Sequence, residues 1–384
     1  MVERSTAYTR RECLKGIGSA LSLSACPQTT ALGAARRWSI AGERVDKLDA
    51  VDDSMRRFMQ ERGIRAGAVA VARQGEVLFE RAYTWAEPDY PVTGTMSPFR
   101  LASVSKAFTE ALIYNLVQAN AVKLDMPVFP YLGLERAALP GQSVDPRLRT
   151  ITVGQLLDHR GGWDRKAAHF DPCFRMREIA IKLGLRSAPT KWDIARYMTG
   201  EPLQFDPGGR ESYSNFGYLM LGLVAEKAAN DSYGNALKTR VTAPAGIDAV
   251  FVARTRKDMR LPGEGFYDQP GTGLTPEFPD RKVLAPLAYG GEGWLTEAMD
   301  AAGGLAATAG AVARLAGHFA IWGFGPRRSG RWARSGGMAG TSSCAVSRPD
   351  GTDYCVVINT RNLPPSAMSD AVSQIDGVFD ATEL

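Results

Sequence analysis

The two ends of the chain carry the same kinds of element in mirrored order, and this arrangement constrains the fold more than any other feature of the sequence. The front has an amphipathic helical pattern and then two apolar runs around a turn, and the back has the reverse. The predicted ranges are 47–62, 66–73 and 77–83 at the front, and 341–347, 354–360 and 367–379 at the back. Two hairpins with their helices predict one antiparallel sheet that both chain ends complete.

The middle of the chain, from residue 105 to residue 305, has mostly helical patterns broken by Pro- and Gly-rich loops, with clear examples at 191–198 and 216–229. With 384 residues, of which 45% are hydrophobic, the chain can bury a large core. The expected fold class is therefore α+β, an antiparallel sheet flanked by helices with an inserted helical lobe at roughly 106–300. Ligand sites commonly lie between two lobes, so motifs at the lobe junctions are the first candidates.

At the first junction, Ser103 and Lys106 stand three residues apart at the predicted start of a helix. Residues at this spacing share a helix face, so Lys106 can hydrogen-bond the Ser103 hydroxyl and take its proton. The helix N-terminus would offer a backbone N–H and a positive dipole to a developing oxyanion. Alone, the pattern is common, and a helix-capping serine with a solvated lysine would give the same letters.

A second motif, from Asp206 to Tyr218, contains Tyr213-Ser214-Asn215. In an extended segment, a spacing of two puts Tyr213 and Asn215 on the same side. A phenol beside a lysine can move protons to and from a nucleophile and a leaving group, and an amide can bind a substrate carbonyl. The alternative is a turn before a helix, with Tyr213 packed in the core.

The third motif is Arg334-Ser335-Gly336-Gly337, at the entrance to the late strands. Its glycines would let a ligand approach the backbone closely, so we expect Ser335 and Gly336 to contact substrate. On a sheet edge beside the nucleophile, the N–H of Gly337 would join that of Ser103 in an oxyanion hole, and Arg334 would add positive potential. The alternative is a Gly-rich turn with an exposed arginine.

These motifs, with the longer runs Leu156 to Trp163 and Ala302 to Leu305, resemble the family of class C β-lactamases, DD-peptidases and related esterases over residues 45–384. The resemblance implies a β-lactamase/transpeptidase-like fold. It also implies a role for each site residue. Ser103 would be the acylated nucleophile, Lys106 and Tyr213 the proton-transfer pair, and Asn215 the residue that orients substrate.

The chain departs from that family at the third motif, which usually begins Lys-Thr-Gly or His-x-Gly where this chain has Arg334-Ser335-Gly336. An arginine keeps the charge but cannot give up a proton. We therefore expect Arg334 to bind a substrate carboxylate or to polarise Tyr213, and not to act as a base.

The sequence lacks the motifs that other hydrolytic mechanisms require. The histidines are His159, His169 and His318, and there is neither a Gly-x-Ser-x-Gly elbow nor a His-Glu-x-x-His motif, which argues against a Ser-His-Asp triad and a zinc peptidase. We interpret His159 as a scaffold residue. No metal or organic cofactor is expected. The formal net charge of +5 is mild and its basic residues are mostly scattered, so no nucleic-acid partner is expected.

Residues 1–26 resemble an export signal. Arg10 and Arg11 precede a weakly apolar stretch at 16–25, as in twin-arginine signals. The run Leu-Ser-Ala-Cys that ends at Cys26 resembles a bacterial lipobox, in which the cysteine is lipidated and tethers the protein to a membrane. These features predict a periplasmic or cell-envelope location.

Ordinary cleavage within 31–35 is the alternative to lipidation, and an unstructured cytoplasmic tail is the alternative to export. We expect residues 27–44 to be a linker and residues 45–384 to form the catalytic domain. No other segment is long and apolar enough to suggest a transmembrane helix.

Three cysteines fall in the predicted catalytic domain, an odd number that argues against a disulfide framework. Cys344 and Cys355 flank the turn Arg348 to Gly351, and a four-residue turn would set them directly opposite each other on a hairpin. A disulfide is then one outcome, but two buried free thiols are the favoured one.

The leading functional hypothesis is a serine hydrolase that forms an acyl-enzyme on Ser103 and hydrolyses small esters or amides. The alternatives are a β-lactamase or D-Ala-D-Ala carboxypeptidase, and a non-catalytic relative that binds envelope ligands. The expected substrate is accordingly a small-molecule ester, an amide or a peptidoglycan-like compound.

Overall fold

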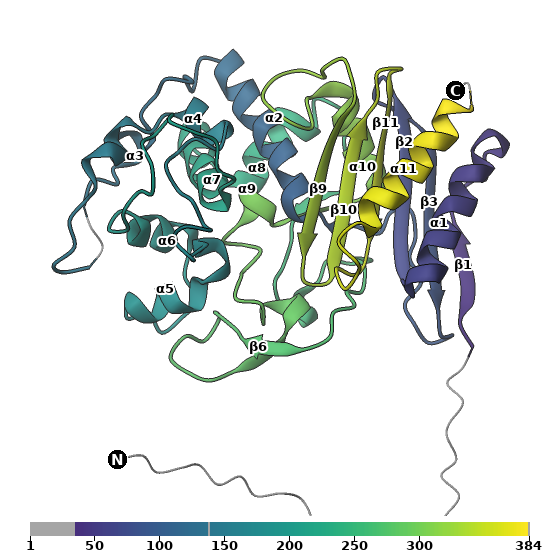
Figure 1. Cartoon of the computed structure of the whole chain (residues 1–384), viewed down its shortest axis with the longest axis horizontal. Helices are drawn as coiled ribbons and strands as arrows, with labels where there is room; N and C mark the ends of the chain where they lie inside the picture. The colour runs from purple at the N-terminus through teal and green to yellow at the C-terminus, as the bar shows by residue number, and fades with distance from the viewer. Residues whose placement is uncertain (1–34, 137–138, 383–384) are drawn as a thin grey trace, which may run out of the picture. The chain divides into compact units, whose positions relative to one another are not determined.

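The computed structural model describes residues 35–136 and 139–382 (Figure 1). The chain divides into two units, residues 1–34 and 35–384, of which the second is described below. The predicted export signal and Cys26 lie outside the described residues. Within the described ranges, no helix combines the length and the apolar composition needed to cross a membrane.

A six-stranded antiparallel sheet, in the order β1-β3-β2-β11-β10-β9, organises this unit. Its strands are β1 (Arg37–Ala41), β2 (Ala66–Arg73), β3 (Glu76–Ala86), β9 (Trp332–Met338), β10 (Thr341–Ser347) and β11 (Thr352–Ile358). Strands β2 and β11 pair along seven residues, which joins the first hairpin to the last. The predicted sheet built from both chain ends is confirmed.

Each face of the sheet is covered by helices. On one face, α1 (Asp49–Arg62) and α11 (Ala367–Asp380) lie side by side and bury Phe58 and Phe379 against Val71 and Tyr354 (Figure 1). On the other face lie α10 (Ala309–His318) and the inserted lobe. All residues of β10 and β11 are buried, because these central strands are covered on both faces.

The inserted lobe consists of helices joined by long loops, and two minor sheets lie in and beside it. Its helices are α2 (Ser105–Gln118), α3 (Val128–Leu132), α4 (Val153–Leu157), α5 (Met176–Lys182), α6 (Lys191–Met198), α7 (Asn215–Ala229), α8 (Tyr233–Leu237) and α9 (Asp300–Gly303). The short strands are β4 (Phe99–Arg100), β5 (Val250–Val252) and β8 (Leu305–Ala307) in one sheet, and β6 (Thr272–Leu274) and β7 (Leu284–Pro286) in the other. The helices predicted at 191–198 and 216–229 are α6 and α7.

The prediction of a linker over 27–44 is wrong for its last part, because residues 37–41 form the edge strand β1. The segment alternates apolar and polar residues, and Trp38 and Ile40 pack against the core under α1 and α11. The Trp38 ring stacks on that of Trp85, with 6.1 Å between centroids. The folded unit therefore includes residues before position 45.

The prediction that Cys344 and Cys355 lie directly opposite each other is also wrong. Cys344 lies opposite Val356 and Cys355 opposite Ala345, so the two thiols point to opposite faces of the sheet. The reason is the turn, in which the Arg348 N–H donates to the Thr352 carbonyl and leaves a three-residue loop that ends at Gly351 with φ +90°. Both cysteines are free and buried, as the favoured alternative expected.

Candidate active site

The backbone around Ser103 forms a sharp corner between a strand and a helix. Strand β4 leads into a 3-10 turn (Ala102–Val104), which runs directly into α2. Ala102 has φ +45°, a left-handed conformation that costs energy for a residue with a Cβ. Lys106 lies one turn later and is fully buried, so the predicted placement of both residues at a helix start is confirmed.

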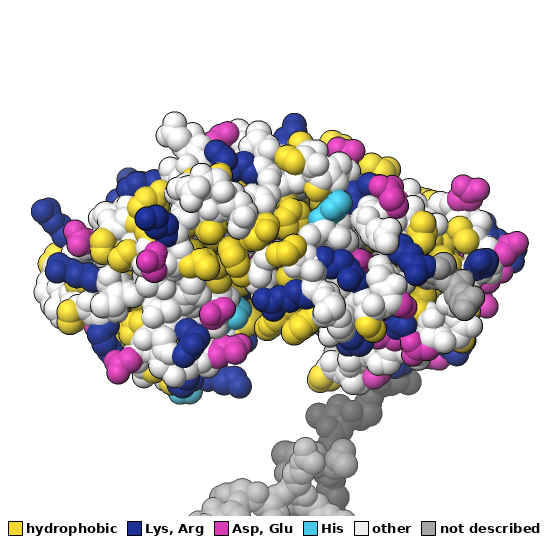
Figure 2. All heavy atoms as spheres, turned by 90° about the horizontal axis from the view of Figure 1, so that it is seen from above, with side chains coloured by type: hydrophobic (Ala, Val, Ile, Leu, Met, Phe, Trp, Pro, Cys, Tyr) yellow, Lys and Arg dark blue, Asp and Glu magenta, His cyan; other side chains and the backbone are white. Residues whose placement is uncertain are grey.

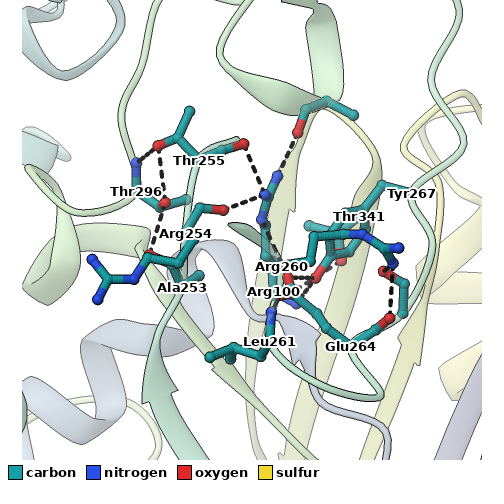
Figure 3. Close-up of polar contacts among 12 residues, drawn as sticks. Arg100, Ala253, Arg254, Thr255, Arg260, Leu261, Glu264, Tyr267, Thr296 and Thr341 are labelled. Atoms are coloured by element: carbon teal, nitrogen blue, oxygen red, sulfur yellow. Dashed lines mark hydrogen bonds and ion pairs between the residues drawn. The ribbon is translucent and has the colours of Figure 1, made fainter. Parts of the chain in front are cut away.

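Arg100 holds this corner in place from inside the protein. Its fully buried guanidinium faces Glu264 at 3.6 Å and lies 4.5 Å from the centre of the Tyr267 ring. It also donates to three backbone carbonyls from two loops, those of Arg254, Thr255 and Ala288 (Figure 3). These contacts tie the strand that precedes Ser103 to the surrounding loops, which fixes the position of the nucleophile.

Ser103, Tyr213 and Lys106 meet as the sequence predicted. The Ser103 Oγ lies 2.6 Å from the Tyr213 hydroxyl and 3.3 Å from the Lys106 Nζ. Nζ also donates to Asn215 Oδ1 at 2.8 Å and to the Ala302 carbonyl. Both oxygens accept hydrogen bonds from the ammonium group, so these two contacts hold the Lys106 Nζ in place beside the Ser103 hydroxyl.

Tyr213 is placed and tuned to accept a proton. Burial by itself raises the pKa of its phenol, but the charge of Lys106, hydrogen bonding and the charge of Arg334 outweigh burial, so the pKa is lowered from its ordinary value of 10.0. With its 2.6 Å contact to Ser103, Tyr213 has the geometry of a general base.

Asn215 differs from the prediction in its local structure and agrees with it in its location. Ser214 caps α7 by accepting from the Gly217 N–H, and Asn215 is the first helical residue. Its Oδ1 accepts from Lys106, and its Nδ2 donates to Asp171 Oδ2 at 2.8 Å. Asn215 and Tyr213 line the same pocket as Ser103, as the second motif predicted.

The third motif lies on β9, the edge strand of the sheet, as predicted. Ser335 and Gly337 line the Ser103 pocket. Gly336 does not line it, because this residue faces the nucleophile backbone, where a Cβ would lie 2.3 Å from the Leu101 carbonyl and 2.9 Å from the Ser103 nitrogen. The expected substrate contact of Gly336 is therefore corrected to a close packing role. The oxyanion role of Ser103 and Gly337 stays a prediction.

The prediction that Arg334 binds a substrate carboxylate is wrong. Its guanidinium donates to Glu110 Oε1 at 2.6 Å, and both side chains are only 2% exposed. Its Nε donates to the Ile321 carbonyl. Glu110, on α2, already supplies the carboxylate that the charge requires, so Arg334 does not reach the pocket. Its charge does lower the pKa of Tyr213, which supports the second expected role.

His159 is a buried residue that touches the site without joining it. Its backbone is left-handed with φ +54°, and its Nδ1 accepts from the Ser214 N–H at 3.2 Å. Its ring lies 4.5 Å from that of Tyr213. Burial and the charges of Lys106 and Arg334 lower its pKa to about 3, so it stays neutral, in accord with a scaffold role.

The pocket around Ser103 has a volume of about 320 Å³ and a wall of mixed polar and apolar surface. Its lining includes five residues that sequence reasoning did not find, namely Arg165, Phe174, Met299, Trp322 and Met338. Met338 follows Gly337 of the third motif on β9, whereas the other four come from separate segments that no local pattern brings together. No group of three or more His, Cys, Asp or Glu among the described residues could hold a metal ion. On the face shown in Figure 2, basic and acidic side chains are interspersed.

Comparisons with known proteins find relatives by sequence. The sequence model of the β-lactamase family matches residues 51–354. Penicillin-binding protein 4* of Bacillus subtilis (strain 168) is 29% identical over 199 residues, which are 50% of this chain and 38% of that protein. Esterase EstB of Burkholderia gladioli is 29% identical over 275 residues, 66% of this chain and 67% of the esterase. This chain thus spans less than half of the first relative.

The fold is similar to that of the D-amino acid amidase from Ochrobactrum anthropi SV3 complexed with L-phenylalanine amide. The TM-score is 0.63 with 17% sequence identity, over 88% of this chain and 99% of the amidase. At this identity the likeness concerns the fold alone.

Proposed function

The chain belongs to the β-lactamase family, and we propose that it is a serine hydrolase that cleaves small esters or amides through an acyl-enzyme on Ser103. The observation that carries this proposal is the 2.6 Å contact between the Ser103 Oγ and the Tyr213 hydroxyl, beside Lys106. A nucleophile within hydrogen-bond reach of a base, itself held by a third group, is the arrangement that acyl transfer needs.

In acylation, Tyr213 in its phenolate form takes the Ser103 proton while Oγ bonds to the substrate carbonyl carbon. The carbonyl electrons move onto oxygen, where the backbone N–H groups of Ser103 and Gly337 would donate to them. Collapse of this intermediate breaks the bond to the alcohol or amine, which leaves with the proton from Tyr213.

Deacylation repeats the sequence with water. Tyr213, again a phenolate, takes a proton from a water that attacks the acyl carbon, and the Ser103 Oγ leaves with that proton. Lys106 assists both acylation and deacylation, because its positive charge favours the phenolate form of Tyr213. Its contacts with Asn215 and Ala302 keep it in place. No metal or organic cofactor enters these steps.

The pocket favours small substrates. Its volume of about 320 Å³ is at the lower end of the ~300–1,000 Å³ usual for ligand pockets. Among the described residues, Arg165 is the charged one that lines it, and its guanidinium lies 5.2 Å from the Tyr213 ring centre. The relative named esterase supports an ester substrate. The relative named penicillin-binding protein keeps a β-lactam or D-amino-acid peptide as the alternative.

A covalent label tests this proposal. The protein is incubated with a fluorophosphonate and, separately, with a labelled penicillin, and peptide mass spectrometry locates any adduct. We expect an adduct on Ser103 with at least one probe and none in Ser103→Ala. Absence of an adduct with both probes would favour the non-catalytic ligand-binding relative. A panel of p-nitrophenyl esters, nitrocefin and D-amino-acid peptides then ranks the substrates.

The location is a second part of the proposal. We propose export to the periplasm or cell envelope, directed by residues 1–26 and with a lipid on Cys26 as the anchor. Cell fractionation of the wild type and of Arg10→Lys/Arg11→Lys tests export, and metabolic labelling with a palmitate analogue tests Cys26. A soluble exported product with no label would replace lipidation by ordinary cleavage.

A further inference from the structure

Trp322 occupies an unusual place beside the nucleophile. Its side chain lines the Ser103 pocket, yet the residue is 37% exposed, whereas the large aromatic side chains of the core are almost completely buried. The mechanism described above does not use it. A large exposed indole in the wall of a pocket can serve as a binding surface.

The indole is supported from behind by the buried arginine. The Arg334 guanidinium carbon lies 4.5 Å from the centre of the Trp322 ring, and its Nε donates to the carbonyl of the preceding residue, Ile321. Arg334 is in turn held by Glu110 at 2.6 Å. The buried ion pair of Arg334 and Glu110 thus fixes both the indole of Trp322 and the backbone of the residue before it.

The loop that carries Trp322 is closed and anchored. Phe319 and Pro326 form an isolated bridge, and the Ala320 N–H donates to the Gly325 carbonyl at 3.1 Å. Phe319 and Phe324 both contact the ring of Tyr114 on α2 edge-on, with centroids 6.4 and 5.4 Å away. The indole is therefore held in position before any substrate binds.

We propose that Trp322 determines the specificity of the site by stacking with an aromatic ring carried by the ester or amide substrate. This inference rests on the proposed function. Phe174, Met299 and Met338 complete an apolar wall around the same pocket, which suits such a ring. The arginine of the third motif thus acts on substrate through the tryptophan that it supports.

The test uses pairs of substrates that match in size and differ in aromaticity. On the alcohol side these are benzyl acetate and cyclohexylmethyl acetate, and on the acyl side ethyl 3-phenylpropanoate and ethyl 3-cyclohexylpropanoate. The readout is the ratio of kcat/KM within each pair, so a general change in activity cancels. In the wild type we expect the aromatic member to be favoured about 3- to 10-fold in at least one pair.

Four variants locate the effect. Trp322→Phe is expected to retain the preference and Trp322→Leu to lose it. Trp192→Leu is the matched control, because Trp192 on α6 is also 37% exposed but does not line the pocket. Glu110→Leu/Arg334→Met keeps the indole and removes its support, and is expected to reduce the preference about two- to threefold. Thermal melts confirm that each variant folds.

Two results would overturn the inference: equal kcat/KM within both pairs for the wild type, or an unchanged preference in Trp322→Leu. The proposed function fails separately, when Ser103→Ala still hydrolyses these esters at the wild-type rate. A dead Ser103→Ala with no aromatic preference in the wild type would remove only the role of Trp322.

Discussion

Two arginines, Arg100 and Arg334, are buried in similar ways and serve different parts of the molecule. Both are at most 2% exposed, both face a glutamate, and both lie against a tryptophan ring. The tryptophan beside Arg100 is Trp294, which is fully buried, whereas the one beside Arg334 is Trp322, which borders the pocket. The same chemistry therefore builds scaffold in one place and substrate contact in the other.

The two arginines also differ in the number of their partners. Arg100 is surrounded by three backbone carbonyls and three aromatic rings, so its charge is bound mainly to the scaffold. Arg334 depends on one carboxylate, that of Glu110, and one carbonyl. Replacing Arg100 leaves several polar groups without a partner, whichever single neighbour is replaced with it. Arg334 and Glu110, in contrast, can be replaced together by two apolar side chains.

The largest effect is expected for Arg100→Met/Glu264→Leu. We expect a loss of about 3–5 kcal/mol in the free energy of unfolding, because three carbonyls, two of them in buried contacts, lose their donor even when the glutamate is also removed. Urea denaturation followed by circular dichroism measures this loss. Arg256→Met is the control, since that arginine pairs with Asp258 at the exposed surface and its replacement should leave the unfolding curve nearly unchanged. A double variant as stable as the wild type would contradict the scaffold role.

The pair at the site should behave in the opposite way. Arg334→Met alone should cost about 3–5 kcal/mol, because it leaves the Glu110 carboxyl buried without its partner. Glu110→Leu/Arg334→Met should recover most of that loss, because two apolar side chains replace the ion pair. Tyr218, which also donates to Glu110, keeps the Leu157 carbonyl as a second acceptor at 3.1 Å. If both variants are equally unstable, the comparison between the two arginines fails.

The pH profile gives a smaller but more specific difference. Tyr213 acts as a base in its deprotonated form, so kcat/KM should rise with pH through its lowered pKa and be lost as pH falls below it. Arg334→Met removes one of the charges that lower this pKa, so the acidic limb should move to higher pH. Arg254→Met should leave the limb in place. The groups that face the phenol are Ser103, Lys106, His159, Arg165 and Arg334.

The smallest effect concerns the pH dependence of stability. His159 has a pKa of about 3 in the folded protein, below its ordinary 6.5, so the unfolded chain binds the extra proton between those values. Stability should therefore fall as pH falls below 6.5, by up to about 1.4 kcal/mol per pH unit from this group. His159→Asn, which suits the left-handed backbone, should flatten that slope in urea unfolding at pH 7 and 5.5. An unchanged slope would mean that other groups control it.

The sequence predicted those helices and strands whose own residues show a clear periodicity of apolar positions. The helices at 191–198 and 216–229 and both terminal hairpins are where the sequence placed them. Helix α10 was missed although Arg314 and His318 mark a less buried face opposite its apolar residues, because no element was predicted between residues 305 and 341. Strand β1 was missed because five residues give a short alternation. Such elements become visible only when the sheet they join is known.

The residues of the site likewise divide into those that a local sequence pattern reveals and those that it does not. Ser103, Lys106 and Tyr213 could be found because each belongs to a recognisable run of residues. The partner of Arg334 could not, because Glu110 is 224 positions away and looks like an ordinary helical glutamate. The register of Cys344 and Cys355 was missed by one residue, since the sequence does not reveal where the turn closes.

That one-residue register has a practical consequence for the thiols. Burial raises the pKa of Cys173, Cys344 and Cys355, so little thiolate forms in the native state and alkylating reagents have no access to it. The two hairpin cysteines cannot be joined by an oxidant while the sheet is intact. Each therefore becomes reactive only when its part of the sheet opens, and the rate of alkylation at Cys344 or Cys355 reports that opening without an added probe.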